Sequence, residues 1–479
     1  MSGRAETTGV IPGRAAISVG RADMPTPKGW KWTKLTDVAR LESGHTPSRK
    51  HPEYWDGGIP WIGIKDARIH HGKTIHSTLQ TVTQEGLDNS AARLLPPGTI
   101  CLSRTASVGY SFVLGDTMAT SQDFVNWVCS DGIVPDFLMY AFMAEGEGLK
   151  SFGQGTTHTT IYYPEVKALH LCHPPTDEQR RIVARIEELF SRLDAGVAAL
   201  RHAKSQLQRY KKSVLAAAVT GQLTQAWREQ HADTEPAEEL LERILEQRRE
   251  LWDGRRKYKE PPTPITEGLP SLPSTWTWAT VAQQASPDER AITDGPFGSK
   301  LKSSHYTDSG PRVLRLQNIG DGVFKDAFAH IPEKHFQTLL NHQIFAGDLL
   351  IRALGIPAHQ TCMIPPSVGP AIVKADCIRF KVFEPHVNPR FTLLALNSDP
   401  VRSRSEKHIH GVGRPRLNGT EIKSIALPLA PIAEQNQIVA EVEARTSAID
   451  HLEAELDRQI TRSKRLRQST LASAFAGIL

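Results

Sequence analysis

The chain of 479 residues is long enough for about three or four domains with ample buried core. Its formal net charge of +5 is too small to establish a nucleic-acid partner, because a soluble, mixed surface explains it equally well. Five scattered cysteines without a CxxC pair argue against a disulfide framework or a zinc site and favour a reducing, cytoplasmic compartment. No apolar run approaches the roughly 18 residues that a transmembrane helix needs.

Residues 1–24 carry Arg and Gly but no apolar stretch of a signal peptide, so we expect a disordered leader. Residues 25–173 are expected to form a first globule. Short β-type runs such as IPWIGI and DFVNWVC, separated by Pro and Gly turns, predict its strands. A short helix is expected at about 135–150, followed by a polar Gly/Thr loop and a final strand.

The sequence pattern of residues 174–223 predicts one long helix. Apolar or small residues recur at steps of three and four, which keeps one face of a helix on a seam, as in a coiled coil. Pro174 and Pro175 end the preceding strand, and Gly221 marks the end of the helix. An exposed apolar seam is unstable in water, so the helix needs a partner. The seam residues are Ile182, Ile186, Leu189, Leu193, Val197, Leu200, Ala203, Leu207, Tyr210 and Val214.

The partner is predicted in the same chain, in residues 431–479. The two stretches align without a gap at a spacing of 256 positions, so that Glu178-Gln179 matches Glu434-Gln435. Such a repeat is typical of internal duplication. The second seam is imperfect, since Arg445 and Ser463 lie on it. Its apolar positions are Ile438, Val442, Ile449, Leu452, Leu456, Ile460 and Leu466.

The composition of residues 224–269 predicts a connector, in which one or two short charged helices precede a Pro-rich spacer. Residues 270–430 repeat the first globule in outline. Each globule opens on paired tryptophans, GWKW at Trp30 and TWTW at Trp276, which we interpret as hydrophobic anchors and not as stacking platforms. The predicted fold class is α+β, with two mixed α/β globules alternating with two long helices.

Catalytic motifs are not found in the sequence. It has no phosphate-cradling G-x-x-x-x-G-K-[ST] loop, no dinucleotide fingerprint and no Asp/Asn-Pro-Pro-aromatic run. Glu165 and Lys167 resemble part of a metal-dependent nuclease site, but no paired Asp is evident and we expect both on the solvent face of a strand. His70-His71 has no third metal ligand nearby. We therefore predict no catalytic residue, bound cofactor or metal in this chain.

Side chains suited to DNA occupy loops of both globules. Lys and Arg contact phosphates, whereas Arg, Gln and Asn can form paired hydrogen bonds with guanine or adenine edges. For any one residue a solvated surface position is the commoner explanation, but the loops as a class favour binding. The predicted DNA-binding residues are Lys65, Arg104, Gln154, Thr156, Thr157 and His158 in the first globule, and Lys300, Lys302, Arg315, Gln317, Asn318, Arg352, Arg414, Arg416 and Asn418 in the second.

One motif carries a family resemblance: proline, two spacers, Glu-Gln, two residues and Ile-Val, as in PPTDEQRRIV from 174 and APIAEQNQIV from 430. With its two globules and two alike helices, the chain resembles the specificity subunit of a type I restriction–modification system over about residues 27–479. The resemblance implies that each globule is a target recognition domain for one half of a split double-stranded DNA site. It also implies that the helices pair as an antiparallel coiled coil that sets the distance between the readers.

The same resemblance implies partner subunits. Two modification subunits would carry S-adenosylmethionine and methylate adenine, and restriction subunits would hydrolyse ATP with Mg²⁺ and cleave DNA. Two alternatives stay open: a coiled-coil scaffold whose globules bind protein, and a nuclease or methyltransferase with an unfamiliar site. The bases recognised do not follow from the sequence, because a side chain constrains a base only when its position in the groove is known.

Overall fold

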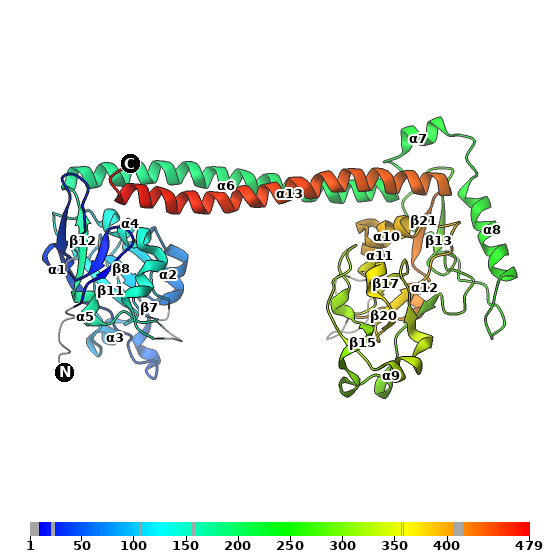
Figure 1. Ribbon diagram of the computed structural model, residues 1–479, viewed down its shortest axis with the longest axis horizontal. Helices are drawn as coiled ribbons and strands as arrows, with labels where there is room; N and C mark the ends of the chain where they lie inside the picture. The colour runs from blue at the N-terminus through cyan, green and yellow to red at the C-terminus, as the bar shows by residue number, and fades with distance from the viewer. Residues whose placement is uncertain are drawn as a thin grey trace. The chain divides into compact units, whose positions relative to one another are not determined.

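The computed structural model describes residues 9–20, 24–105, 107–155, 159–355, 357, 359–405 and 415–479. The chain divides into two compact units (Figure 1). Unit 1 comprises Met1–Arg201 with Leu456–Leu479, and unit 2 comprises His202–Glu455. Each unit therefore contains one sheet-bearing globule, the beginning of one long helix and the end of the other.

Unit 1 carries a mixed α/β globule with three sheets. Their strand orders are β4-β11-β8-β9-β6, β10-β5-β7 and β1-β2-β12-β3. Strand β10 runs parallel to β5, whereas β12 and β3 are antiparallel. The elements are β1 Ile11–Pro12, β2 Ile17–Val19, β3 Lys31–Lys34, α1 Leu35–Val38, β4 Ala39–Ser43, η1 Pro52–Tyr54, β5 Trp55–Ile62, α2 Ile64–His70, β6 Thr74–Ile75, β7 Gln80–Val82, α3 Gln84–Asp88, β8 Ile100–Ser103, β9 Ser111–Leu114, β10 Ala119–Thr120, β11 Phe124–Cys129, α4 Pro135–Glu145, η2 Gly146–Phe152, α5 Tyr163–Lys167 and β12 Leu169–His173.

The core of unit 1 forms around α4, which packs against β8 and β9. Pro135 suits the first helical position because its missing N–H would have no partner there. The helix is apolar on nearly every side, with Phe137 and Phe142 fully buried. Phe190 and Phe475 of the two long helices join the same cluster, so the helix ends of unit 1 share the core of its globule.

The expectation of a disordered leader over residues 1–24 is wrong for residues 9–20. Strand β2 pairs with β12, and Ile17 is fully buried. The carboxylate of Glu145, at the end of α4, accepts hydrogen bonds from the backbone N–H groups of Ala15 at 2.8 Å and Ile17 at 2.9 Å. A three-residue strand is too short to show a hydrophobic periodicity in the sequence, and it forms because a distant strand of the chain pairs with it.

Unit 2 repeats the main pairings. Its sheets have strand orders β14-β20-β17-β18, β15-β19-β16 and β13-β21, with β15 and β19 parallel. The elements are α7 Gln225–Gln230, α8 Ala237–Glu250, β13 Thr277–Thr280, β14 Ile292–Thr293, η3 Gly298–Lys300, η4 Ser303–His305, β15 Thr307–Leu314, η5 Leu316–Asn318, α9 Glu333–Gln337, η6 Leu340–His342, β16 Gln343–Ile344, β17 Leu349–Arg352, β18 Thr361–Met363, η7 Pro366–Val368, β19 Ala371–Val373, β20 Cys377–Phe380, α10 Pro389–Asn397, α11 Asp399–Ser405, α12 Gly419–Lys423 and β21 Ala426–Leu429.

The two long helices are α6, Thr176–Val219, and α13, Ile432–Phe475, each of 44 residues. Within unit 1, Arg467 of α13 pairs with Asp194 of α6 at 3.0 Å. Within unit 2, Lys211 of α6 pairs with Asp450 of α13 at 2.6 Å. Most predicted seam positions are at least half-buried. The exposed exceptions are Ala203, Tyr210 at 47%, Leu452 at 51% and Leu466 at 44%.

The Glu-Gln pair at the start of each long helix fastens that helix to the globule of its own unit. In unit 1 the indole N–H of Trp30 donates to Glu178 Oε1 at 3.1 Å. In unit 2 that of Trp276 donates to Glu434 Oε2 at 2.8 Å. Both tryptophans are buried, which confirms their interpretation as anchors.

The glutamine of each pair is fully buried and fixes the start of a globule helix. Gln179 Oε1 accepts from the backbone N–H of Val134, the N-cap of α4, at 2.9 Å. Gln435 Oε1 accepts from Asn388, the N-cap of α10, at 2.8 Å. Each amide NH₂ also donates to the carbonyl five positions earlier. The repeat visible in the sequence is thus a repeat of the same fastening.

The connector contains the two short helices that were predicted, α7 and α8. It is also packed into unit 2, which the sequence did not indicate. Ala237, Leu240 and Ile244 of α8 are fully buried against the core of that globule. Arg248 donates to the backbone carbonyl of Ala282 at 2.7 Å. Figure 1 shows α8 alongside the sheet elements of unit 2.

The segment PEVK, expected on a strand, forms the short helix α5 instead. Pro164 lies in its first turn, where proline is well tolerated. Glu165 is only 6% exposed and lies 3.5 Å from the amide of Gln154, so it faces inward. None of the helices in the described part of the chain is long and apolar enough to cross a membrane.

Candidate nucleic-acid interface

In each unit a short turn forms backbone hydrogen bonds with the end of one strand and with the loop that follows another strand. In unit 1, Ser121 N–H donates to the carbonyl of Ile62 at 2.9 Å, and Arg104 N–H donates to that of Asp123 at 2.8 Å. In unit 2, Lys374 N–H donates to Leu314 O and Ala353 N–H to Asp376 O, at 2.8 and 2.9 Å. The turn 121–123 therefore corresponds to 374–376, and both place the end of a parallel strand beside a second loop.

A third loop meets the second in the same way. Ile161 N–H donates to Arg104 O at 2.8 Å, and Leu417 N–H donates to Ala353 O at 2.9 Å. We call this array of loops the polar edge. It comprises the described residues of 44–50, 63–66, 103–109, 121–123 and 154–162 in unit 1, and of 294–302, 315–318, 352–360, 374–376 and 415–418 in unit 2.

Glycine is required where the loop 44–50 approaches the turn 121–123, and where the loop 294–302 approaches the turn 374–376. A Cβ atom on Gly44 would overlap the backbone of Ser121, and one on Gly295 would overlap the backbone of Lys374. Only a residue without a side chain permits this close approach of two backbones. Gly44 and Gly295 thus hold the first loop of each polar edge against the turn.

Lys65 and Gln317 occupy matching positions just after the parallel strand. Both follow an N-cap residue, Gly63 or Arg315, whose backbone N–H donates to the side chain three residues later. That side chain is Asp66 in unit 1 and Asn318 in unit 2. Lys65 and Gln317 are exposed, and neither side chain has a hydrogen bond within the described residues.

Asn318 was predicted to contact DNA, and the structure contradicts this. The side chain is fully buried. Its Oδ1 accepts from the N–H of Arg315 at 2.9 Å, and its Nδ2 donates to the carbonyls of Lys325 and Ala327 at 2.9 and 2.8 Å. These bonds leave no donor for a base, so Asn318 shapes the loop that presents Gln317.

Arg104 and Arg352, both predicted to bind DNA, do not occupy equivalent positions in the two units. Phe124 faces Ser103 across the sheet, whereas the corresponding Cys377 faces Arg352. Arg352 therefore matches Ser103, and a one-residue difference in a strand changes the face on which a side chain lies. Both residues hold the loop that follows: Ser103 Oγ donates to Ser107 O, and Arg352 Nε donates to Leu354 O at 2.7 Å.

Arg104 is half-buried, and its guanidinium lies 4.9 Å from the ring centre of Tyr163. The residue after Arg104 contacts the Gly-rich loop, since Thr105 and Thr160 share a hydrogen bond of 2.9 Å. Gln154 is exposed in that loop and pairs with Thr160. The predicted residues Thr156, Thr157, His158 and Arg414 lie outside the described residues.

Arg416 occupies the position of Thr160 and is held by two carboxylates. Its Nε lies 2.8 Å from Asp376, and its Nη2 lies 3.6 Å from Asp294. Burial raises the pKa of Asp294 to about 6, although N–H groups of Gly295 and Asp376 and the charge of Arg416 oppose the shift. Arg416 is therefore partly neutralised within unit 2, and its charge is shared with these two carboxylates.

The remaining predicted residues divide into exposed and engaged side chains. Lys300 and Lys302 are exposed beside η3 and η4. Arg315 donates to the carbonyl of Phe328 at 2.9 Å and is half-buried. Asn418 is the N-cap of α12, and its Oδ1 accepts from the N–H groups of Thr420 and Glu421, so it acts as a helix cap.

Sequence reasoning missed the residues that organise the polar edge. Ser121, Asp123 and Asp376 connect the loops through backbone hydrogen bonds, and no side-chain motif predicts them. Arg49 stacks its guanidinium 3.6 Å from the ring centre of Trp55. The pairing of a basic residue with an aromatic one six positions later was the available signal.

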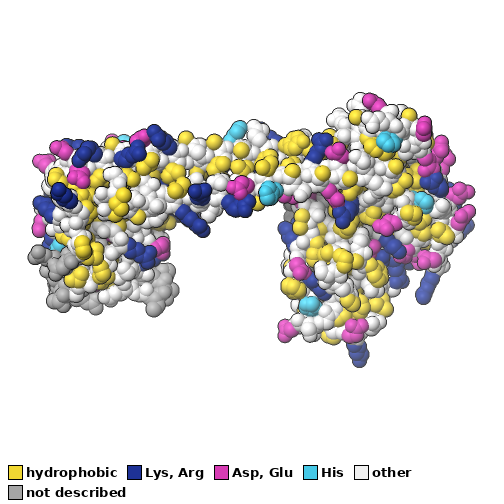
Figure 2. Space-filling model, turned by 45° about the horizontal axis from the view of Figure 1, so that its top comes forward, with side chains coloured by type: hydrophobic (Ala, Val, Ile, Leu, Met, Phe, Trp, Pro, Cys, Tyr) yellow, Lys and Arg dark blue, Asp and Glu magenta, His cyan; other side chains and the backbone are white. Residues whose placement is uncertain are grey.

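The charge on the surface is mixed. On the face drawn in Figure 2, Lys and Arg side chains alternate with Asp, Glu and hydrophobic side chains. This distribution agrees with the small net charge of +5. Any contact with DNA phosphates therefore depends on a few placed cations, not on a broad positive field.

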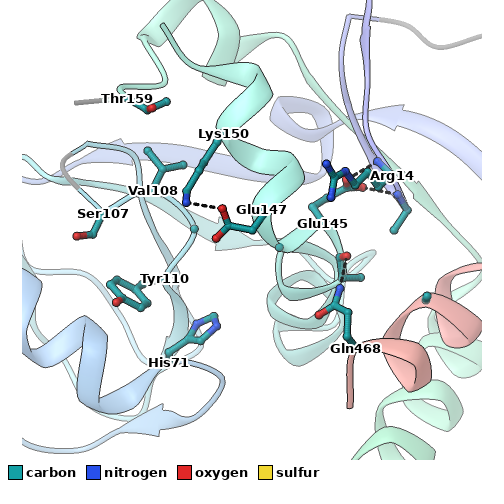
Figure 3. Close-up of a pocket in the computed structure, with 15 residues that line it drawn as sticks. Arg14, His71, Ser107, Val108, Tyr110, Glu145, Glu147, Lys150, Thr159 and Gln468 are labelled. Carbon is teal, nitrogen blue, oxygen red and sulfur yellow. Dashed lines mark hydrogen bonds and ion pairs between the residues drawn. The ribbon is translucent and has the colours of Figure 1, made fainter. Parts of the chain in front are cut away.

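A hollow of about 960 Å³ lies beside the loop at Ser107–Tyr110 in unit 1 (Figure 3). Its charged groups engage one another or the backbone. Lys150 pairs with Glu147, Glu145 binds the N-terminal segment, and Gln468 of α13 donates to Ala144 O at 2.9 Å. The hollow is thus a junction between the loop, α4 and α13.

The chain is similar to known proteins of one family. Residues 27–199 match the family model described as type I restriction modification DNA specificity domain. The EcoDI specificity subunit of Escherichia coli is 22% identical over 460 residues, covering 95% of this chain and 89% of that protein. Over nearly its whole length the chain is similar to the specificity subunits of type I restriction enzymes. This confirms the resemblance inferred from the Glu-Gln motif.

Two further comparisons give similar proteins. The MjaIX specificity subunit of Methanocaldococcus jannaschii is 32% identical over 158 residues, which are 33% of this chain and 37% of that protein. A chain solved in work on complex assembly and conformational transition of a type I R-M system superposes with a TM-score of 0.67 at 18% identity, covering 95% of this chain and all of that chain. The latter similarity concerns the fold, a mixed α/β architecture with long helices.

Proposed function

We propose that this chain is the DNA-specificity subunit of a type I restriction–modification complex, and that the polar edge of each unit reads one half of a bipartite site. The observation that carries the proposal is the repeated polar edge. The two units share the hydrogen-bonded frame of turn, strand end and loops, yet they place different side chains on it: Lys65 against Gln317, Thr160 against Arg416. A shared frame with different side chains suits two readers of different sequence.

The long helices would pair as an antiparallel coiled coil that sets the distance between the two half-sites. The ion pairs Asp194–Arg467 and Lys211–Asp450 support this arrangement, because the later position in α6 pairs with the earlier one in α13. The helices would also dock two modification subunits. The chain itself would perform no catalysis.

The partner subunits would supply the chemistry. S-adenosylmethionine would be bound by the modification subunits, and ATP with Mg²⁺ by the restriction subunits. The target would be double-stranded DNA. Cations such as Lys300 and Lys302 would contact phosphates, and these contacts position the protein without specifying sequence.

The test is to express the chain with a modification subunit of its family and map methylated adenines across a host genome. The proposal predicts a split motif, two short specific halves around a gap of fixed length. Removing one helical turn from the middle of both α6 and α13 should change the gap and keep the halves. A continuous motif would mean that one unit is silent, and no methylation would favour a protein-binding scaffold.

A further inference from the structure

We propose that Lys65 and Gln317 are the matched base-reading residues of the two units, Lys65 contacting a guanine and Gln317 an adenine in the major groove. The inference rests on the proposed function and extends it to a specific position on the polar edge. It starts from three observations: the equivalence of the two positions, the freedom of the two side chains, and their different chemistry.

The equivalence follows from backbone hydrogen bonds and not from sequence similarity. Ile62 and Leu314 each end the strand that pairs in parallel with β10 or β19, and each carbonyl accepts from the turn. Lys65 and Gln317 both come three residues after these carbonyls. The two side chains therefore leave the same frame at the same point.

A reading side chain must be presented from a rigid base, because discrimination depends on hydrogen-bond geometry. Asp66 provides this base in unit 1: it is 2% exposed and accepts from the N–H groups of Gly63 at 3.0 Å and Leu79 at 2.8 Å. Asn318 provides it in unit 2 through its three buried hydrogen bonds. The residue just before each of these is held in place while its own side chain stays in solvent.

Three arginines of the polar edge of unit 2 are less available than Lys65 and Gln317. Arg315, Arg352 and Arg416 of unit 2 each spend hydrogen bonds on a carbonyl or a carboxylate of their own unit. Lys65 and Gln317, in contrast, have exposed side chains without hydrogen-bond partners among the described residues. They can meet a base without first breaking an internal bond.

The chemistry of the two side chains then assigns the bases. A lysine ammonium group donates to O6 and N7 of guanine, and the amide of glutamine donates to N7 and accepts from N6 of adenine. Both patterns are unique to the major groove. Since the frame is shared, exchanging the two side chains should exchange the preferences.

The experiment uses the full chain with its modification subunit and compares the wild type with Lys65→Gln and Gln317→Lys. Methylation mapping should show guanine replaced by adenine at one position of one half-site in the first variant. The second variant should show the reverse in the other half-site. The gap and all remaining bases should be unchanged, and the affinity for the original duplex should fall about tenfold or more.

Two control variants make the same substitutions, lysine to glutamine and glutamine to lysine, at positions away from the polar edge. Lys73→Gln lies beyond the far end of α2, and Gln230→Lys lies at the end of α7; both positions are exposed. These two variants should keep the wild-type motif. Thermal unfolding of all four variants should match the wild type, because each altered side chain is in solvent.

Two results would overturn the inference while leaving the proposed function intact. If Lys65→Gln weakened binding equally for every sequence and lowered its salt dependence, Lys65 would be a phosphate contact. If both exchange variants kept the wild-type split motif, the reading residues would lie elsewhere on the polar edge. Failure of the wild type to give any split motif would instead refute the proposed function itself.

Discussion

Trp276 donates its indole N–H to Glu434 at 2.8 Å, and the carboxylate of Glu434 is completely shielded from solvent. The same carboxylate accepts from Thr224 Oγ1 at 2.7 Å and pairs with Arg228 at 3.0 Å. It thereby joins the first strand of the globule, the start of α13 and the segment that follows α6. One buried anion ties three parts of unit 2 together.

Replacing Glu434 with glutamine should destabilise unit 2. The substitution keeps the shape and one acceptor but removes the charge that compensates Arg228, and we expect a loss of about 1–3 kcal/mol in the free energy of unfolding. Urea denaturation measures it. Glu178→Gln is the matched control in unit 1, where Glu178 is only half-buried, and it should cost clearly less. Equal losses would contradict this account.

Gln435→Leu should also destabilise unit 2, by about 2–4 kcal/mol, because it leaves the N–H of Asn388 and the carbonyl of Ala430 without partners. Hydrogen exchange should show the loss at the start of α10. The neighbouring substitution Asn436→Leu removes only an exposed contact with Asn388 and should cost little. If both variants behaved alike, the buried amide would not fasten the helix.

Asn318→Ala separates a structural role from a reading role. The substitution removes three buried hydrogen bonds, and we expect about 2–4 kcal/mol of destabilisation. Where the variant remains folded, its methylated motif should be that of the wild type. A changed base in the motif with unchanged stability would restore the original prediction of a base contact.

Asp294 gives unit 2 a defined pH dependence. Because the pKa of Asp294 is raised to about 6, the unfolded chain loses this proton first as pH rises from about 4 to 6. The contribution of Asp294 to stability should therefore fall across that window and stay level above it. Comparing thermal unfolding of the wild type and Asp294→Asn between pH 4 and 7 checks this: the stability of the variant relative to the wild type should rise as pH increases from about 4 to 6.

His359 should give unit 2 the opposite pH dependence of stability. Burial lowers its pKa to about 4, so the unfolded chain binds a proton first as pH falls from about 6.5 to 4. Stability should be lost as pH falls through this window and level off below it. His359→Asn should remove this loss, since asparagine tolerates the positive φ of 36°. Between about pH 4 and 6 the contributions of Asp294 and His359 oppose each other, so each single variant should show a steeper change of stability with pH than the wild type or the double variant with Asp294→Asn.

The long helices could be predicted because their signals are local and repeated. Apolar spacing defines a helix from neighbours in the sequence, and the match between Glu178-Gln179 and Glu434-Gln435 places the second copy. The functions of these residues in fastening the helices could not be predicted. Their partners Trp30 and Trp276 are about 150 residues away, and only the folded globule brings them together.

The candidate site was predictable as a set of loops and not residue by residue. Lys65, Gln317, Lys300 and Lys302 are exposed as expected. Asn318 has the same side-chain type as a base reader, but the loop that returns at Lys325 and Ala327 buries it. That Arg352 matches Ser103 and not Arg104 could not be predicted, because strand register is set by cross-strand partners, which a single sequence does not reveal.

Helix α8 lies in the sequence between the two repeats, yet its apolar face belongs to the core of unit 2. An exchange that replaced only residues 270–430 would leave the original α8 against a new globule. Exchange between relatives should therefore succeed when residues 224–430 are transferred together. In this chain the unit that can be exchanged is larger than the globule of residues 270–430, and its boundaries lie just after α6 and just before α13.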